Sequence, residues 1–171
     1  MRVTASSCIV GALLVGVGAA AQPVPPADQL PIWAQAKWKE LAKSKGLEIS
    51  TRLNPFVWRA DFDGDGSSDL VIAVRQTSTK KEGIALILRR AKSSHVLGAG
   101  TRFGNGGDDF SWIDIWGIEE RGSTQRSGYD KTVKLQADGI LVAKESSASA
   151  LIYLKSGKPT LQQQGDEQPG G

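Results

Sequence analysis

The chain has little of the chemistry on which most metal and redox centres depend. Its 171 residues include one cysteine, one histidine and one methionine. The cysteine, Cys8, lies in an apolar N-terminal run, which excludes a disulfide scaffold, a cysteine-rich zinc site and thiol chemistry. Because His95 is the only histidine, a metal site built from several histidines is excluded as well.

Charge of one sign is also missing. The 21 Lys and Arg residues nearly balance the 18 Asp and Glu residues, and the net charge is +3, so we expect no nucleic-acid partner. No glycine-rich loop follows a strand and opens a helix, which leaves nucleotide binding without support. With 40% hydrophobic and 23% charged residues, the composition is typical of one globular domain.

The N-terminus has the order of a secretory signal. In residues 1–21, Arg2 precedes an apolar stretch, and small residues follow at Ala19 and Ala21. The stretch is shorter than the ~20 residues that a membrane-spanning helix needs. We therefore expect cleavage after Ala21, a periplasmic or secreted location and no membrane attachment afterwards. A retained anchor is the alternative.

One helix is expected near the start of the mature chain. Residues 22–29 contain three prolines and predict an extended leader, and residues 30–45 predict a helix, with Pro31 in its first turn and Gly46 just past its end. Its apolar face comprises Ala34, Trp38, Leu41 and Ala42. Its basic residues are Lys37, Lys39, Lys43 and Lys45. We expect these lysines to form a solvated face; a surface for a membrane or a partner is the alternative.

From Leu47 onward the pattern is that of β-structure. Short apolar or alternating runs occupy residues 56–60, 70–74, 83–88, 111–118, 132–135, 140–143 and 148–154. Asp138-Gly139 and Ser156-Gly157 are typical turn dipeptides. The fold class predicted is mainly β: an antiparallel sheet, a small sandwich or partial propeller-like blades, with one N-terminal helix. We expect a single domain over residues 30–164 and a flexible tail over residues 165–171.

The segment that carries chemistry is the acidic loop at residues 61–69. Asp61, Asp63, Asp65 and Asp69 stand at its positions 1, 3, 5 and 9, so their charges repel unless a hard divalent cation binds them. Gly66 allows the chain to reverse, and the carbonyl of Ser67 can join the ligands. An oxygen-only shell of this kind suits Ca²⁺ better than Mg²⁺.

The loop has two other interpretations, an EF-hand and a turn that binds no metal. An EF-hand needs a glutamate at position 12, but Ile72 stands there, and the flanking segments are predicted strands rather than helices. The EF-hand is therefore rejected. A solvated acidic turn that binds no metal remains the alternative to a calcium site.

Residues 60–74, ADFDGDGSSDLVIAV, resemble the calcium-binding hairpin of FG-GAP/VCBS repeats, the blades of integrin-type β-propellers. The resemblance implies calcium ligands at Asp61, Asp63, Asp65 and Asp69 and at the backbone of Ser67. It covers one hairpin, and no second copy of the motif follows, so this chain cannot close a propeller alone.

Residues 104–112 and 145–150 resemble a family of small exported bacterial proteins that carry one such loop. Some exported proteins with this loop act as immunity partners of cell-wall hydrolases. The resemblance therefore implies a protein partner in the periplasm, with such a hydrolase as the candidate, and a role as its inhibitor.

A second acidic group, Asp108, Asp109 and Asp114, lies beside Trp112 and Trp116. It can be a carboxylate pair that acts on a glycan, a second cation site, or a turn that leads into a strand. If residues 111–116 form a strand, Trp112, Asp114 and Trp116 share one face and suit a partner-binding surface. The opposite face, with Ile113 and Ile115, would then enter the core.

Three classes of function follow from these observations. No Ser-His-Asp arrangement is indicated around His95, so we expect a non-catalytic binding protein. The alternatives are a glycan-acting enzyme that uses Asp108, Asp109 or Asp114, and a structural or adhesive β module.

Overall fold

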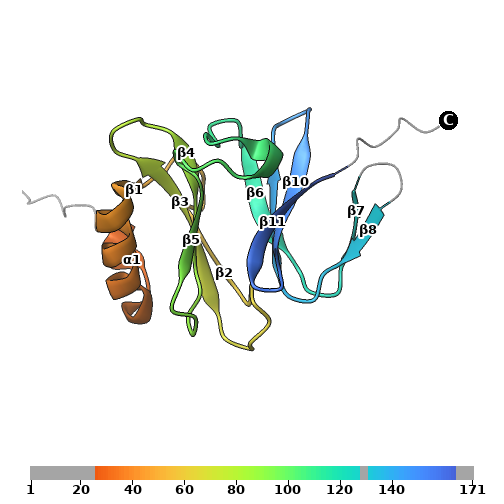
Figure 1. Ribbon diagram of the computed structural model, residues 1–171, viewed down its shortest axis with the longest axis horizontal. Helices are drawn as coiled ribbons and strands as arrows, with labels where there is room; N and C mark the ends of the chain where they lie inside the picture. Colours follow the sequence, from red (N-terminus) through yellow and green to blue (C-terminus); the bar gives the residue numbers. More distant parts are fainter. Residues whose placement is uncertain (1–25, 128–130, 165–171) are drawn as a thin grey trace, which may run out of the picture.

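The computed structural model describes residues 26–127 and 131–164. The expected signal and tail, residues 1–21 and 165–171, lie outside these ranges. The described chain is mainly β, with two antiparallel sheets and one α-helix at its N-terminal side, which is the predicted fold class (Figure 1).

The N-terminal segment is more regular than the sequence indicated. Residues 22–25 of the expected extended leader lie outside the described ranges, and residues Pro26–Gln29 of it form a short 3-10 helix, η1. The α-helix, α1, spans Ile32–Lys45 and begins directly after Pro31, whose missing N–H costs nothing there. It ends at Gly46, which is left-handed with φ 63° and donates its N–H to Ala42.

The first sheet has β3 and β4 at its centre. Its strands are β1 (Leu47–Ile49), β2 (Val57–Ala60), β3 (Asp69–Gln76), β4 (Glu82–Ile87) and β5 (Ser94–Gly98). They are ordered β1-β3-β4-β5, and β2 also pairs with β3. Strands β1 and β2 pair with the end and the start of β3 respectively, so together they form one edge.

The second sheet is ordered β11-β10-β9-β6. Its strands are β6 (Ile115–Glu119), β9 (Gly139–Ala143), β10 (Ser149–Lys155) and β11 (Lys158–Gln163). The predicted Ser156-Gly157 dipeptide makes the two-residue turn between β10 and β11, in which Lys155 pairs with Lys158. A separate two-stranded ribbon consists of β7 (Thr124–Ser127) and β8 (Lys131–Lys134).

Helix α1 and the two sheets form three layers, with the first sheet in the middle (Figure 1). On one face of β3, Leu70, Ile72 and Val74 pack with Ala34 and Trp38 of the helix. On the other face, Val71 and Ala73 join the core between the sheets. Burial on both faces explains why residues 70–74 are apolar without alternation.

The strand expected at residues 111–118 is shorter than predicted. Residues 110–113 form a turn, in which the N–H of Ile113 donates to the carbonyl of Phe110, and β6 begins only at Ile115. The predicted alternation of faces is therefore wrong: Trp116 is 6% exposed within the inter-sheet core, whereas Ile115 is 54% exposed. Ile113 is fully buried as expected, but it belongs to the turn, so it does not share a strand register with Trp116.

One lysine of α1 departs from the expected solvated face. The Nζ of Lys37 donates hydrogen bonds to the carbonyl oxygens of Leu88, Arg89 and Ala91, at 2.6, 2.9 and 2.7 Å. The other three basic residues, Lys39, Lys43 and Lys45, are exposed as expected. Lys37 therefore fixes the β4–β5 loop to the helix layer.

We predict that Lys37→Met lowers the free energy of unfolding by about 1–3 kcal/mol, because three carbonyl oxygens lose a charged donor in a half-buried place. Urea unfolding measures the change. Lys39→Met, at an exposed position of the same helix, is the matched control and is expected to be neutral. Equal stability of the two variants would contradict the proposed role of Lys37.

Candidate metal site

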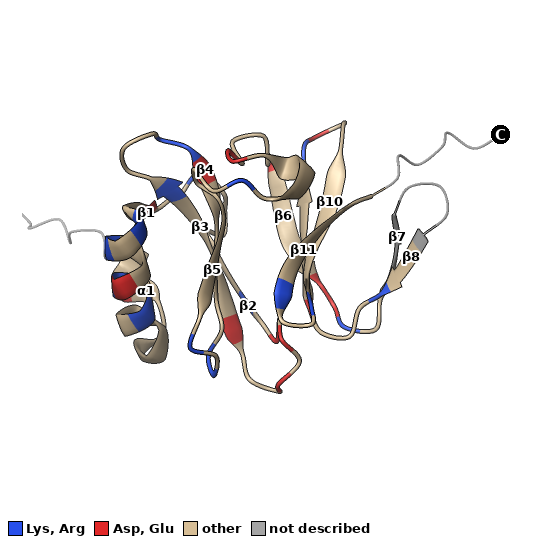
Figure 2. Ribbon diagram, viewed as in Figure 1, with Lys and Arg blue, Asp and Glu red and all other residues tan. Residues whose placement is uncertain are grey.

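The acidic loop connects β2 to β3 at one end of the sandwich (Figure 1). Phe62, between the first two aspartates, is 2% exposed and packs in the core between the sheets. Burial of this ring anchors the start of the loop, while the alternate residues Asp61 and Asp63 remain half-buried at its surface. Figure 2 shows this acidic loop beside the basic β4–β5 loop.

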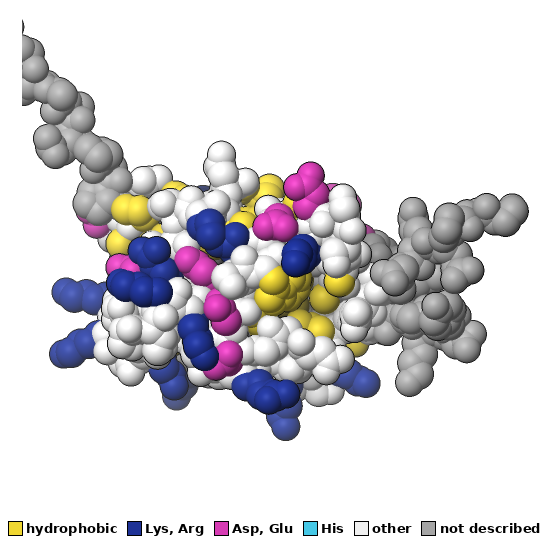
Figure 3. Space-filling model, turned by 90° about the horizontal axis from the view of Figure 1, so that it is seen from above, with side chains coloured by type: hydrophobic (Ala, Val, Ile, Leu, Met, Phe, Trp, Pro, Cys, Tyr) yellow, Lys and Arg dark blue, Asp and Glu magenta, His cyan; other side chains and the backbone are white. Residues whose placement is uncertain are grey.

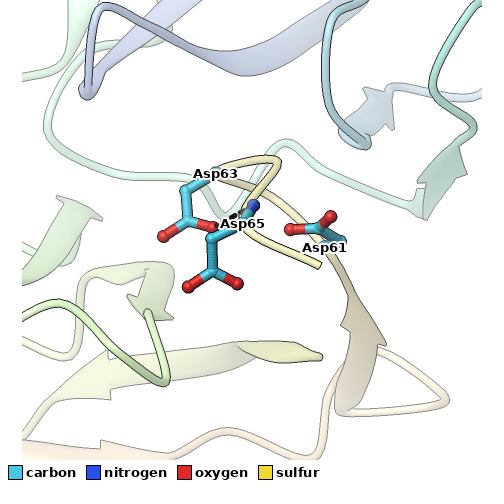
Figure 4. A group of neighbouring side chains, drawn as sticks. All are labelled: Asp61, Asp63 and Asp65. Carbon is cyan, nitrogen blue, oxygen red and sulfur yellow. Dashed lines mark hydrogen bonds between the residues drawn. The ribbon is translucent and has the colours of Figure 1, made fainter. Parts of the chain in front are cut away.

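Three of the predicted ligands converge. Each of Asp61, Asp63 and Asp65 offers a carboxylate oxygen, and these oxygens lie within 4.8 Å of one another. Figure 4 shows the carboxylates of Asp63 and Asp65 side by side, with the carboxylate of Asp61 turned toward them. In the part of the chain that the structure describes, this is the one group of three or more acidic, histidine or cysteine side chains that can hold a metal ion.

Each of the three carboxylates uses one oxygen to hold the loop in shape. Asp61 Oδ2 accepts the N–H of Gly66 at 3.0 Å, and Asp63 Oδ1 accepts that of Asp65 at 3.1 Å. Asp65 Oδ1 accepts the N–H of Ser67 at 2.7 Å. The second oxygen of each carboxylate accepts no N–H of the described loop, so the loop arranges three oxygens before any cation binds.

One of these second oxygens, that of Asp61, lacks a hydrogen-bond partner. Asp61 Oδ1 is buried from solvent and accepts no hydrogen bond from the described residues. A buried carboxylate oxygen without a partner costs free energy, because it has lost its water without replacement. A cation between the three aspartates would satisfy it.

Backbone geometry supports the close approach of the aspartates. Gly66 has φ 79°, a left-handed conformation that strains other residues, and this confirms the turn expected at this position. The turn directs the N–H of Gly66 back to Asp61 across five residues.

Of the predicted ligands, Asp69 and Ser67 lie deeper than the other three. Asp69 is fully buried, and its two oxygens accept the N–H groups of Phe62 at 3.1 Å and Arg89 at 2.7 Å. Each of these oxygens keeps a free lone pair. Ser67 is 8% exposed. The structure therefore groups the first three aspartates and places Asp69 behind them as a support of both neighbouring loops.

The negative charge of each carboxylate makes ionisation of its neighbours less favourable. Burial raises the pKa of Asp69 to about 6, and the negative charges of Asp63 and Asp65 add to this effect. Burial also raises the pKa of Asp63, with further contributions from Asp65 and Asp61. The local potential is thus strongly negative, which favours a cation.

A residue that the sequence does not indicate, Asp138, holds the acidic loop from the side of the second sheet. Asp138, in the turn before β9, accepts the N–H of Asp61 at 2.9 Å through Oδ2, and the N–H of Arg121 at 2.9 Å through Oδ1. Its own N–H donates to the carbonyl of Asp61 at 3.0 Å. In the sequence, Asp138-Gly139 indicates only a turn. A turn dipeptide does not predict a hydrogen bond to a residue 77 positions away.

The second acidic group is not brought together as a site. Asp108 forms an ion pair with Lys81 at 2.5 Å, which lowers the pKa of Asp108. Asp109 accepts the N–H groups of Glu82 and Ser111, and Asp114 accepts that of Glu145. Asp108 is thus paired with a lysine, and Asp109 and Asp114 each accept backbone N–H groups.

Of the three predicted partner-binding residues, Trp112 alone lines a groove. Trp116 is buried, and its Nε1 donates to the carbonyl of Pro55 at 2.8 Å. Asp114 is exposed. Trp112 is half-buried, and its Nε1 donates to the carbonyl of Gly106 at 3.2 Å. Because residues 110–113 form a turn and Asp114 precedes β6, these side chains do not make the continuous strand face that was expected.

The groove beside Trp112 has a volume of about 290 Å³ and a mostly apolar lining. Ala150 and Leu161 contribute apolar surface, and Lys144 and Gln163 contribute polar groups. Figure 3 shows apolar side chains in a hollow of this face, with charged residues of both signs around them. The groove lies at the end of the sandwich opposite the acidic loop (Figure 1).

No protein-family model matches this chain, and no curated protein or solved structure matches it. None of the helices within residues 26–127 and 131–164 has the length and apolar character to cross a membrane.

We predict that Asp138→Ala lowers the free energy of unfolding by about 1–3 kcal/mol, because two backbone N–H groups lose a carboxylate acceptor. Thermal and urea unfolding check this. Glu120→Ala, which removes an exposed carboxylate from the connection after β6, serves as the control. If both variants unfold like the unaltered protein, Asp138 does not hold the acidic loop.

Proposed function

We propose that the protein is an exported, non-catalytic calcium-binding protein whose loop at residues 61–69 holds one Ca²⁺. The observation that carries this proposal is the convergence of Asp61, Asp63 and Asp65 around a buried, unpartnered oxygen of Asp61. Three carboxylates with oxygen as the only ligand type suit a hard cation.

Calcium suits this loop better than magnesium. Ca²⁺ takes six to eight oxygens in flexible geometry, whereas Mg²⁺ requires a near-ideal octahedron and usually keeps several waters. The carbonyl of Ser67 and a free lone pair of Asp69 are the further protein ligands in this proposal, as the resemblance to the FG-GAP/VCBS loop implies. Bound Ca²⁺ would neutralise the acidic loop and stabilise the connection between β2 and β3.

Export is supported by residues 1–21 of the sequence, and calcium outside the cell would then load the site. An affinity in the range of extracellular calcium modules, with Kd about 10⁻⁴–10⁻³ M, is sufficient for this role. The ion is proposed to be structural, because its ligands come from a loop that joins two strands of one sheet.

The second part of the proposal is a protein partner at the groove beside Trp112. A half-buried tryptophan in an apolar hollow with a polar rim has the character of a protein-binding hot spot. A hydrolase of the cell wall remains the class of partner that the resemblance implies. The glycan-acting alternative has less support, because all three carboxylates have other partners. Asp108 pairs with Lys81, and Asp109 and Asp114 accept backbone N–H groups.

We predict that Ca²⁺ binds with one site per chain and raises the melting temperature, whereas a chelator lowers it. At a free calcium concentration of 100 times Kd, the gain in unfolding free energy is about 2.7 kcal/mol. Isothermal titration calorimetry and thermal unfolding with and without chelator measure both effects. Mg²⁺ at equal concentration is expected to stabilise less.

Substitutions in the loop test which residues bind the ion. Asp61→Asn and Asp65→Asn are expected to weaken calcium binding at least about tenfold, because each removes an anionic ligand. Asp28→Asn, at an exposed position of η1, leaves the affinity unchanged. Identical melting curves in chelator and in excess calcium would refute the calcium proposal.

We predict that a partner captured by the protein from a periplasmic extract is lost with Trp112→Ala, because the substitution removes the aromatic wall of the groove. Affinity capture followed by a direct binding assay with the purified partner measures the loss. Ile115→Ala, at an exposed apolar position of β6, is the control. A partner that binds both variants equally does not use the groove.

A further inference from the structure

A basic side chain of the neighbouring β4–β5 loop contacts the acidic loop. Arg90, in the loop between β4 and β5, donates through Nη1 to the carbonyl oxygen of Asp65 at 3.1 Å. Its Nε lies 3.9 Å from Asp65 Oδ2. That oxygen belongs to the carboxylate whose other oxygen accepts the N–H of Ser67. Any cation held by the three aspartates must therefore share Asp65 with a guanidinium group.

The position of Arg90 is set by its neighbours and not only by its own side chain. Lys37 binds the carbonyl oxygens of Arg89 and Ala91, on either side of it. The N–H of Arg89 donates to the buried carboxylate of Asp69. Because the backbone is held on both sides, the loop presents Arg90 to Asp65 at a small entropic cost compared with a free surface pair.

Arg89 offers a natural comparison within the same loop. Its guanidinium carbon lies 5.5 Å from the centroid of the Trp33 ring, on the helix layer. Two adjacent arginines thus have different tasks: Arg89 contacts α1, and Arg90 contacts the acidic loop.

We propose that Arg90 is an affinity-setting residue that weakens calcium binding at the loop, a proposal that rests on the calcium site proposed above. A positive charge next to Asp65 repels a divalent ion twice as strongly as a monovalent ion at the same distance. It also occupies the carbonyl oxygen of Asp65. Arg90 thereby keeps the affinity of the site for calcium low, so that the site fills at the calcium concentrations found outside cells.

The side chain of Arg90 is 68% exposed, so solvent and salt screen its charge. The repulsion is therefore expected to be moderate and to depend on ionic strength. At about 1 M salt the Debye length is only about 3 Å, and the influence of Arg90 on the site should nearly vanish.

The test is calcium titration of the full-length mature protein by calorimetry, at low and high KCl. Arg90→Gln is expected to tighten the calcium Kd by roughly three- to tenfold at low salt, and the ratio to the unaltered protein should approach one at about 1 M KCl. Arg90→Lys keeps the charge and should stay near the original affinity. Arg89→Gln removes the same charge from the adjacent position and should change Kd less than about twofold.

The outcomes separate this inference from the calcium proposal. If the unaltered protein binds calcium and Arg90→Gln leaves Kd unchanged or weakens it, Arg90 does not oppose the ion and the inference is wrong, while the calcium site stands. Equal tightening by Arg89→Gln would also overturn it, because net charge alone would then explain the effect. Absence of calcium binding in the unaltered protein would remove the site itself, and the inference with it.

Discussion

The arrangement at the acidic end depends on one buried carboxylate, that of Asp69. It stands at the first position of β3, fully buried, and binds one N–H from the acidic loop and one from the β4–β5 loop. An ionised group at such a depth is tolerated only with strong hydrogen-bond donors around it. The two donors, Phe62 and Arg89, place the acidic loop and the basic loop side by side. Everything that follows at this end, including the contact between Arg90 and Asp65, requires that alignment.

From Asp69, polar contacts extend through all three layers. Lys37 fixes the basic loop to α1, Asp69 joins that loop to the acidic loop, and Asp138 joins the acidic loop to the second sheet. These are hydrogen bonds between backbone groups and charged side chains, which are stronger than hydrogen bonds between neutral groups. A cation at Asp61, Asp63 and Asp65 would lie at the junction of this chain of contacts. Its proposed effect on stability is therefore an effect on how helix and sheets are joined, and not on one loop alone.

The sequence predicts well those features that depend on residues close to one another along the chain. The loop at residues 61–69 is visible because its aspartates alternate within nine positions, and β3 and β4 are visible because each contains an uninterrupted apolar run, residues 70–74 and 84–87. Strands β5, β7 and β11 have mixed or polar sequences and were not predicted, since pairing rather than side-chain pattern defines them. Asp138 and Lys37 could not be recognised, because their partners lie 77 and 51 to 54 residues away. Trp116 was placed on the wrong face because the turn at residues 110–113 resets the alternation.

The proposed calcium site and the groove beside Trp112 lie at opposite ends of the sandwich, and this separation limits how one can influence the other. Between them run β3 and β9, whose buried residues include Val71 and Val142 with no exposed surface. None of the residues that line the groove belongs to the acidic loop, so a bound ion would contact no residue of the groove. Calcium is therefore expected to act on the groove through the population of folded protein rather than through a change in its shape. A partner's affinity for the folded chain should then be the same at low and high calcium, while the fraction of chain able to bind rises with calcium.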